Sequence, residues 1–149
     1  MLKQKIINDL KQAMKEGNAA KRDTLRMLDS MIKNVEIEKK KREEGLSDAE
    51  IEEVAARAIK QRKDSAAQYE AGGRSDLAEN EKKEIEIIMQ YMPEQLGEEE
   101  ARKIIKEIIA EAGAKDKSEI GKVMGAAMSR LKGQIDGTVV KKIAEEELS

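Results

Sequence analysis

The sequence predicts an all-α protein built as two helical bundles, with four helices followed by three. Its composition is 40% charged and 39% hydrophobic but only 1% aromatic, and Ala, Ile, Leu, Met, Glu and Lys dominate. These residues favour helices, and β-branched and aromatic residues are too few for a sheet. Apolar residues also recur every three or four positions, the spacing of a helix with one buried face. Most glycines and the one proline, Pro93, fall between these periodic segments.

Four helices are expected before Pro93, at about 2–16, 19–43, 47–71 and 75–92. Short links between them indicate antiparallel neighbours. Ser47 and Glu50 form a capping box at the start of the third helix. Ser75 or Asp76 caps the fourth helix, and Pro93 ends it because its ring disfavours the preceding helical turn.

Three helices are expected after Pro93. The fifth, at about 98–112, begins with three glutamates and carries the cleanest amphipathic stripe in the chain. Ser118 caps the sixth, which Gly133 ends, and Asp136 starts the seventh. We therefore expect an N-terminal four-helix bundle over residues 1–93 and a C-terminal three-helix bundle over residues 94–149.

The composition excludes several kinds of chemistry. The chain has no cysteine and no histidine, so it lacks thiolate nucleophiles, disulfides, zinc-finger sites and the usual general base near neutral pH. Its glycines do not form a phosphate loop of the Walker type. We expect no catalytic residue, no metal and no cofactor.

Charge is distributed unevenly along the chain, although the net charge is only −2. Residues 1–63 hold 16 Lys/Arg against 12 Asp/Glu, residues 64–100 hold 3 against 11, and residues 101–149 hold 10 against 8. No apolar run approaches the roughly 20 residues of a membrane span, and the N-terminus is unlike a signal peptide. We expect a soluble cytoplasmic protein that does not enter a membrane.

The segment Lys60–Glu81 has two interpretations. In one, Arg62 and its neighbouring lysines approach a phosphate backbone, with Tyr69 close by. In the other, which spacing alone favours, Arg62 and Lys63 are the exterior of a helix, Tyr69 is an anchor at the core edge, and Gly72-Gly73 is a turn.

The segment Ile120–Gly137 is less usual, because Gly121 and Gly125 lie four residues apart on a helix rich in Ala and Met. Such small residues let another helix or a ligand backbone approach closely, and close helix packing is the simpler explanation. Three cations near these glycines have the chemistry to meet phosphates: Lys122, Arg130 and Lys132.

Several segments, in this order, give the chain its resemblance to the YqeY family. They are Arg22–Leu28, Ile32–Glu36, Lys60–Ala66 with Tyr69, Arg74–Glu81, Tyr91–Leu96, Gly121–Gly125, Lys132–Gly133 and Asp136–Gly137. Together they extend over essentially the whole chain. One departure is that Gln134 and Ile135 stand where the family leads us to expect an arginine and a small residue.

The resemblance implies a four-helix bundle joined to a three-helix bundle. It also relates the chain to the tail of GatB, a component of the glutamine-dependent aspartyl/glutamyl-tRNA amidotransferase. That tail packs against tRNA largely by shape. The family is assigned carbon–nitrogen ligase activity, with glutamine as amido-N-donor, by this association.

Three functional hypotheses follow. The first is a tRNA-associated binding module, with tRNA and an amidotransferase or another translation-related protein as partners. Its contact surface would comprise Lys122, Arg130, Lys132, Lys141 and Lys142. The second is a protein-interaction adaptor that docks a partner on the acidic segment 64–100 without binding RNA. The third, an amidotransferase acting alone, is least favoured because no nucleophile or base is visible.

Overall fold

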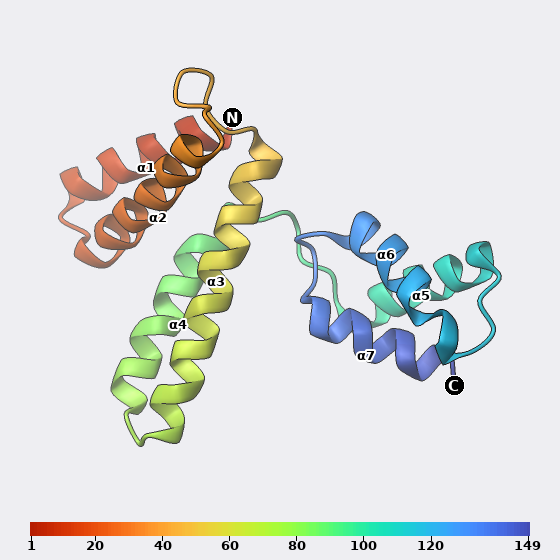
Figure 1. The fold of residues 1–149 in the computed structure, drawn as a ribbon. Coiled ribbons are helices and arrows are strands. Elements are labelled where there is room, and N and C mark those ends of the chain that lie inside the picture. Colours follow the sequence, from red (N-terminus) through yellow and green to blue (C-terminus); the bar gives the residue numbers. More distant parts are fainter. The chain divides into compact units, whose positions relative to one another are not determined.

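The structure, a computed structural model, describes residues 1–149 and is all-helical, with seven α-helices, one short 3₁₀ helix and no strand (Figure 1). This confirms the all-α class. The chain divides into two compact units, Met1–Met92 and Pro93–Ser149. The first contains α1 (Leu2–Glu16), α2 (Ala19–Glu38), α3 (Asp48–Ala71) and α4 (Ser75–Met89). The second contains α5 (Glu98–Ala112), η1 (Lys117–Glu119), α6 (Ile120–Leu131) and α7 (Gly137–Glu147).

The N-terminal unit is made of two helical hairpins, α1–α2 and α3–α4 (Figure 1). Their shared core uses only the first part of α3, as far as Ile59, and the last part of α4 with the turn after it. Beyond that core the α3–α4 hairpin extends past α1 and α2 (Figure 1). The main buried residues of the core are Ile6, Leu25, Leu28, Ile32, Ile51, Val54, Ala55, Ala58, Ile88 and Tyr91.

Polar contacts attach α1 to this core. The hydroxyl of Tyr91, a residue that is only 1% exposed, donates a hydrogen bond of 2.6 Å to Oδ2 of Asp9. Nζ of Lys5 lies 5.3 Å from the centroid of the same ring. Near the C-terminal end of α2, Nζ of Lys3 lies 2.7 Å from Oε1 of the buried Glu36. These contacts compensate two buried polar groups, so α1 has a fixed place against the other helices.

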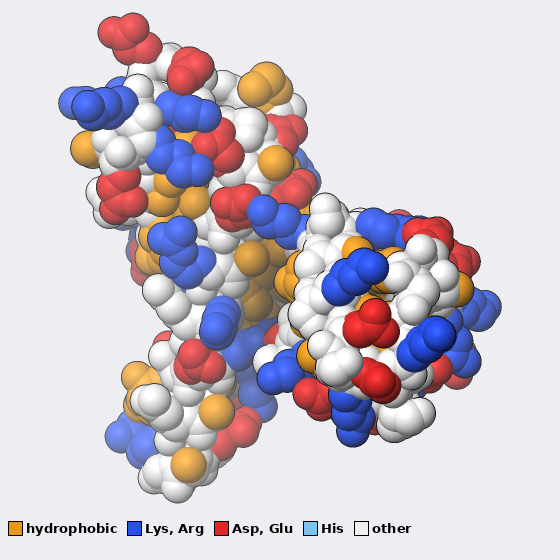
Figure 2. Space-filling view, turned by 45° about the vertical axis from the view of Figure 1, so that its right-hand side comes forward, with side chains coloured by type: hydrophobic (Ala, Val, Ile, Leu, Met, Phe, Trp, Pro, Cys, Tyr) orange, Lys and Arg blue, Asp and Glu red, His pale blue; other side chains and the backbone are white.

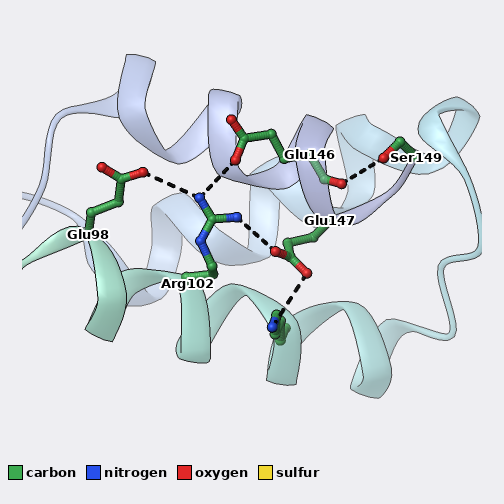
Figure 3. A network of polar contacts seen from close by, with 6 residues as sticks. Glu98, Arg102, Glu146, Glu147 and Ser149 are labelled. Atoms are coloured by element: carbon green, nitrogen blue, oxygen red, sulfur yellow. Dashed lines mark hydrogen bonds and ion pairs between the residues drawn. The ribbon is translucent and has the colours of Figure 1, made fainter.

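The C-terminal unit packs α5, α6 and α7 around a core of Ala101, Ile105, Ile108, Val123, Ala127, Leu131, Val140, Ile143, Ala144 and Leu148. Arg102 of α5 reinforces it by pairing with Glu147 and Glu146 of α7 at 2.7 and 2.8 Å, and with Glu98 at 3.3 Å (Figure 3). The Arg102 guanidinium lowers the pKa of Glu146. The end of α7 is therefore held against α5 by charge as well as by apolar packing.

The structure confirms the capping box at the start of α3. The Ser47 hydroxyl accepts from the Glu50 amide, and a Glu50 carboxylate oxygen accepts from the Ser47 amide. Nζ atoms of Lys39 and Lys41 lie 2.9 and 3.0 Å from the same carboxylate. Hydrogen bonds from the Ser47 amide and then from both lysines lower the pKa of Glu50 to about 2.

Four details of the expected helices are wrong. The second helix ends at Glu38 rather than near 43, because Lys39 and Lys41 turn back to Glu50. The fourth helix ends at Met89, three residues earlier than expected. It also has no side-chain cap, since Arg74 occupies the cap position. In the C-terminal unit, Ser118 does not cap α6: it lies in η1, where its amide donates to the cap residue Asp116, and the cap position of α6 is Glu119, which makes no side-chain cap bond.

Candidate nucleic-acid interface

The outward face of helix α6 carries two glycines beside exposed side chains that include Lys122, Met128 and Ser129. Its inner face buries Val123, Ala127 and Leu131. The opposite face carries Gly121 and Gly125, both exposed, and a Cβ added to either would meet no atom within 4 Å. No helix of the unit packs on these glycines, so close packing within the unit does not explain their spacing. Helix backbone is therefore accessible at these two glycines.

Three of the candidate cations, Lys122, Arg130 and Lys132, belong to α6 and its end. Lys122 is exposed next to Gly121, and its Nζ donates 3.1 Å to the carbonyl of Ala112 at the end of α5. Lys132 is exposed at the C-terminal cap of α6. Helical periodicity puts Lys122, Gly125 and Ser129 on one side of α6. The long, flexible side chain of Lys122 can release the Ala112 carbonyl and bind a phosphate oxygen in its place.

Arg130 faces α5 and is already paired. Its guanidinium nitrogens lie 3.5 Å from carboxylate oxygens of Glu107 and Glu111. Both partners are exposed, and such surface pairs contribute only about 0–1 kcal/mol. Arg130 could therefore change partners at small cost, but in this structure its charge is neutralised.

Lys141 and Lys142 stand on α7 and are exposed. Lys142 lies close enough to Glu146 to contribute to the lowering of its pKa, after the larger effect of Arg102. The five candidate cations are thus distributed over two helices, with Arg130 and Lys142 directed toward acids. Positive and negative side chains are intermixed on the face seen in Figure 2.

The segment Lys60–Glu81 is largely the projecting part of the α3–α4 hairpin, and two expectations about it are wrong. Arg62 is not exterior: its side chain is only 13% exposed, and its guanidinium donates to Glu84 at 2.9 Å and to the Ala58 carbonyl at 3.0 Å. Tyr69 is 36% exposed at the far end of the hairpin, so it does not anchor the core. Arg62 therefore joins α3 to α4 where the apolar core ends.

The structure contains no group of three or more Asp or Glu side chains that could hold a metal ion. None of its helices has the length and apolar character needed to cross a membrane.

Comparison with known proteins relates the chain to one family. Residues 3–148 match the family model described as Yqey-like protein. Several relatives are fungal proteins named "Altered inheritance of mitochondria protein 41, mitochondrial". The protein of Candida glabrata is 37% identical over 86 residues, covering 58% of this chain and 47% of that protein. The protein of Clavispora lusitaniae is 42% identical over 84 residues, covering 56% and 47%. The protein of Pyrenophora tritici-repentis is 28% identical over 141 residues, covering 93% and 76%.

These names contradict the expectation of a cytoplasmic protein, because the relatives are called mitochondrial. Composition and the absence of an apolar run had favoured the cytoplasm, but neither distinguishes it from another aqueous compartment. The chain aligns with about half the length of the first of these relatives.

Proposed function

Because the chain belongs to the YqeY family, we propose that it is a non-catalytic binding module that associates with tRNA. Its role would be linked to glutamine-dependent tRNA amidotransferase function, a carbon–nitrogen ligase activity that uses glutamine as amido-N-donor. The two units would correspond to the four-helix and three-helix bundles of the GatB-like tail. The relatives' names favour a mitochondrial setting for this role.

The observation that supports the proposal best is the exposed glycine face of α6. A phosphate–sugar backbone presents many oxygen acceptors, so it fits a face where helix backbone is accessible and a cation lies beside it. Gly121 and Gly125 provide the accessible backbone, and Lys122 provides the cation. Glycine within a helix costs about 1 kcal/mol relative to alanine, and nothing within the unit offsets this cost.

The chain's own residues would hold and orient RNA rather than transform it. No histidine or cysteine is available as base or nucleophile. Aromatic stacking on single-stranded bases is also disfavoured, since the two tyrosines are Tyr91, which is buried, and Tyr69, which lies in the other unit from α6. Recognition would therefore depend on backbone and shape, and the amidotransferase chemistry would belong to a partner protein.

The test is binding of bulk tRNA to the full chain as a function of salt. Each phosphate contact adds about 0.9 units to the slope of log affinity against log salt for a duplex. We expect the variant Lys122→Ala/Arg130→Ala/Lys132→Ala to reduce the slope by about two to three units. A matched control is Lys103→Ala/Lys115→Ala/Lys117→Ala, which removes three exposed cations of the same unit that lie outside α6.

If the two variants have equal salt slopes, α6 is not part of the tRNA-binding surface. Absence of tRNA binding by the unmodified chain at low salt would refute the proposal. That result would favour the adaptor hypothesis, in which the acidic segment 64–100 docks a protein.

A further inference from the structure

A second cationic surface lies on the N-terminal unit, on the outward side of the α1–α2 hairpin. It comprises Lys11 and Lys15 of α1 with Arg22 and Arg26 of α2, and we call these residues the α1–α2 quartet. Each pair is spaced by four residues, so its members are neighbours on one helix face. The turn at Gly17 makes the helices antiparallel and brings the end of α1 beside the start of α2.

The quartet has few partners within the protein. Lys11, Lys15 and Arg26 are exposed, and no carboxylate lies within ion-pair distance of any of them. The nearby acids include Asp23, which pairs with Arg22 of the quartet and also interacts electrostatically with Arg26. Nε of Arg22 lies 2.9 Å from Asp23, Nζ of Lys33 lies 2.8 Å from Asp29, and the Gln12 amide donates 2.8 Å to Glu16.

The arrangement is unfavourable for an isolated helical hairpin. Like charges four residues apart on a helix repel each other, and the quartet contains two such pairs. The hairpin is stabilised on its opposite side, where Ile6, Leu25 and Leu28 are buried, so its fold does not require these cations. A surface that keeps four like charges together, three of them without an ion-pair partner, is suited to an anionic partner.

The remaining residues on the exposed side of α1 are mainly amides, including Gln4 and Asn8, which hydrogen-bond to each other at 2.9 Å. Amides and cations together suit phosphate and sugar oxygens. Met14, which is 50% exposed, is the one exposed large apolar side chain near the quartet. A helix that lies on a membrane needs a broad apolar face instead.

We propose that the α1–α2 quartet binds the phosphate backbone of RNA, as a contact separate from the α6 face. In its choice of RNA as the partner, this inference rests on the proposed function. The N-terminal unit would then take part in holding tRNA through a surface that does not depend on α6 or α7.

The test uses the full chain with Lys11→Gln/Lys15→Gln/Arg22→Gln/Arg26→Gln, titrated with bulk tRNA at several salt concentrations. The matched control is Arg42→Gln/Arg57→Gln/Lys60→Gln/Lys83→Gln, which removes two arginines and two lysines, all exposed, elsewhere on the same unit. We expect the salt slope to fall by about three units in the quartet variant and by less than about one in the control. If the quartet variant is not helical by circular dichroism, Lys11→Gln/Lys15→Gln replaces it, with an expected fall of about two units.

The outcomes separate this inference from the proposed function. Binding of tRNA by the unmodified chain with no difference between the quartet variant and its control would overturn the inference and leave the proposed function intact. Absence of tRNA binding by the unmodified chain would refute both. Quartet-dependent binding to vesicles containing anionic lipid, without tRNA binding, would assign the surface to membranes and overturn its assignment to RNA.

Discussion

The buried contact between Tyr91 and Asp9 gives the most direct test of how the N-terminal unit is held together. The change Tyr91→Phe keeps the ring in its core site and removes only the hydroxyl that donates 2.6 Å to the Asp9 carboxylate. Hydrogen bonds to charged groups contribute about 1.5–3 kcal/mol. Asp9 is only half-buried and can recover water, so we expect the lower value, about 1.5 kcal/mol. That is about a tenfold change in the unfolding equilibrium.

Both tyrosines lie in the N-terminal unit, so tyrosine fluorescence reports on that unit alone. In urea, a loss of about 1.5 kcal/mol lowers the midpoint by about 1 M, given slopes of about 1–3 kcal/mol/M. The control is Tyr69→Phe, which removes the other hydroxyl at an exposed position and should change stability by less than about 0.5 kcal/mol. Equal midpoints for the two variants, or no coupling with Asp9→Asn in a double-mutant cycle, would refute the argument.

The same contact predicts a dependence on alkaline pH. Burial, followed by the Asp9 hydrogen bond, raises the pKa of Tyr91 well above its usual value near 10. The unfolded chain then loses this proton at a lower pH than the folded chain. The stabilisation is therefore complete below about pH 10 and is lost as the pH rises above it. Tyrosinate absorbance should show one late-titrating tyrosine in the folded protein, and Tyr91→Phe should remove it.

Three further predictions concern other elements. The pKa of Glu50 is lowered to about 2 in the folded chain. The ionised carboxylate therefore stabilises the folded chain above about pH 4.5, and this stabilisation is lost as the pH falls toward 2. Between these pH values the urea midpoint should fall less in Glu50→Gln than in the unmodified chain. Gly113 has φ of 66°, so Gly113→Ala should cost about 1 kcal/mol by thermal unfolding, whereas Gly121→Ala, with open space around the added Cβ inside a helix, should cost nothing. Gly125→Ala should stabilise the C-terminal unit by about 0.5–1 kcal/mol, because the added methyl group meets open space; unchanged or reduced stability would contradict this reasoning.

Local sequence signals predicted the parts of the fold that depend on neighbouring residues. The apolar periodicity predicted the all-α class and the main helices, and both hydrogen bonds of the predicted capping box at Ser47 and Glu50 are present. The end of α2 could not be predicted in this way. It depends on Lys39 and Lys41 reaching Glu50 of the next helix, a contact across a turn whose geometry is set only when α3 is in place.

The sequence predicted which residues form the candidate site but not which of its cations are paired with acids. The sequence identified Gly121, Gly125 and the cations near them, and periodicity alone could have shown that the glycines face away from the buried stripe. It could not show that Arg130 is neutralised, because its partners Glu107 and Glu111 come from another helix. The buried place of Arg62 was missed for a similar reason, since its partner Glu84 lies on α4.

The projecting part of the α3–α4 hairpin has a consequence for local stability. Beyond Ile59 the fully buried side chains of this part of the hairpin are Ala66 and Ala78, Leu77 is half-buried, and Arg62 pairs with the partly exposed Glu84. A segment with so little buried apolar area opens at a lower free energy than the core it extends from. Amide protons near Gly72 should therefore exchange with solvent well before those around Ile32. Removing the same number of helical turns from the end of α3 and the start of α4 would shorten the hairpin and leave the core of the N-terminal unit intact.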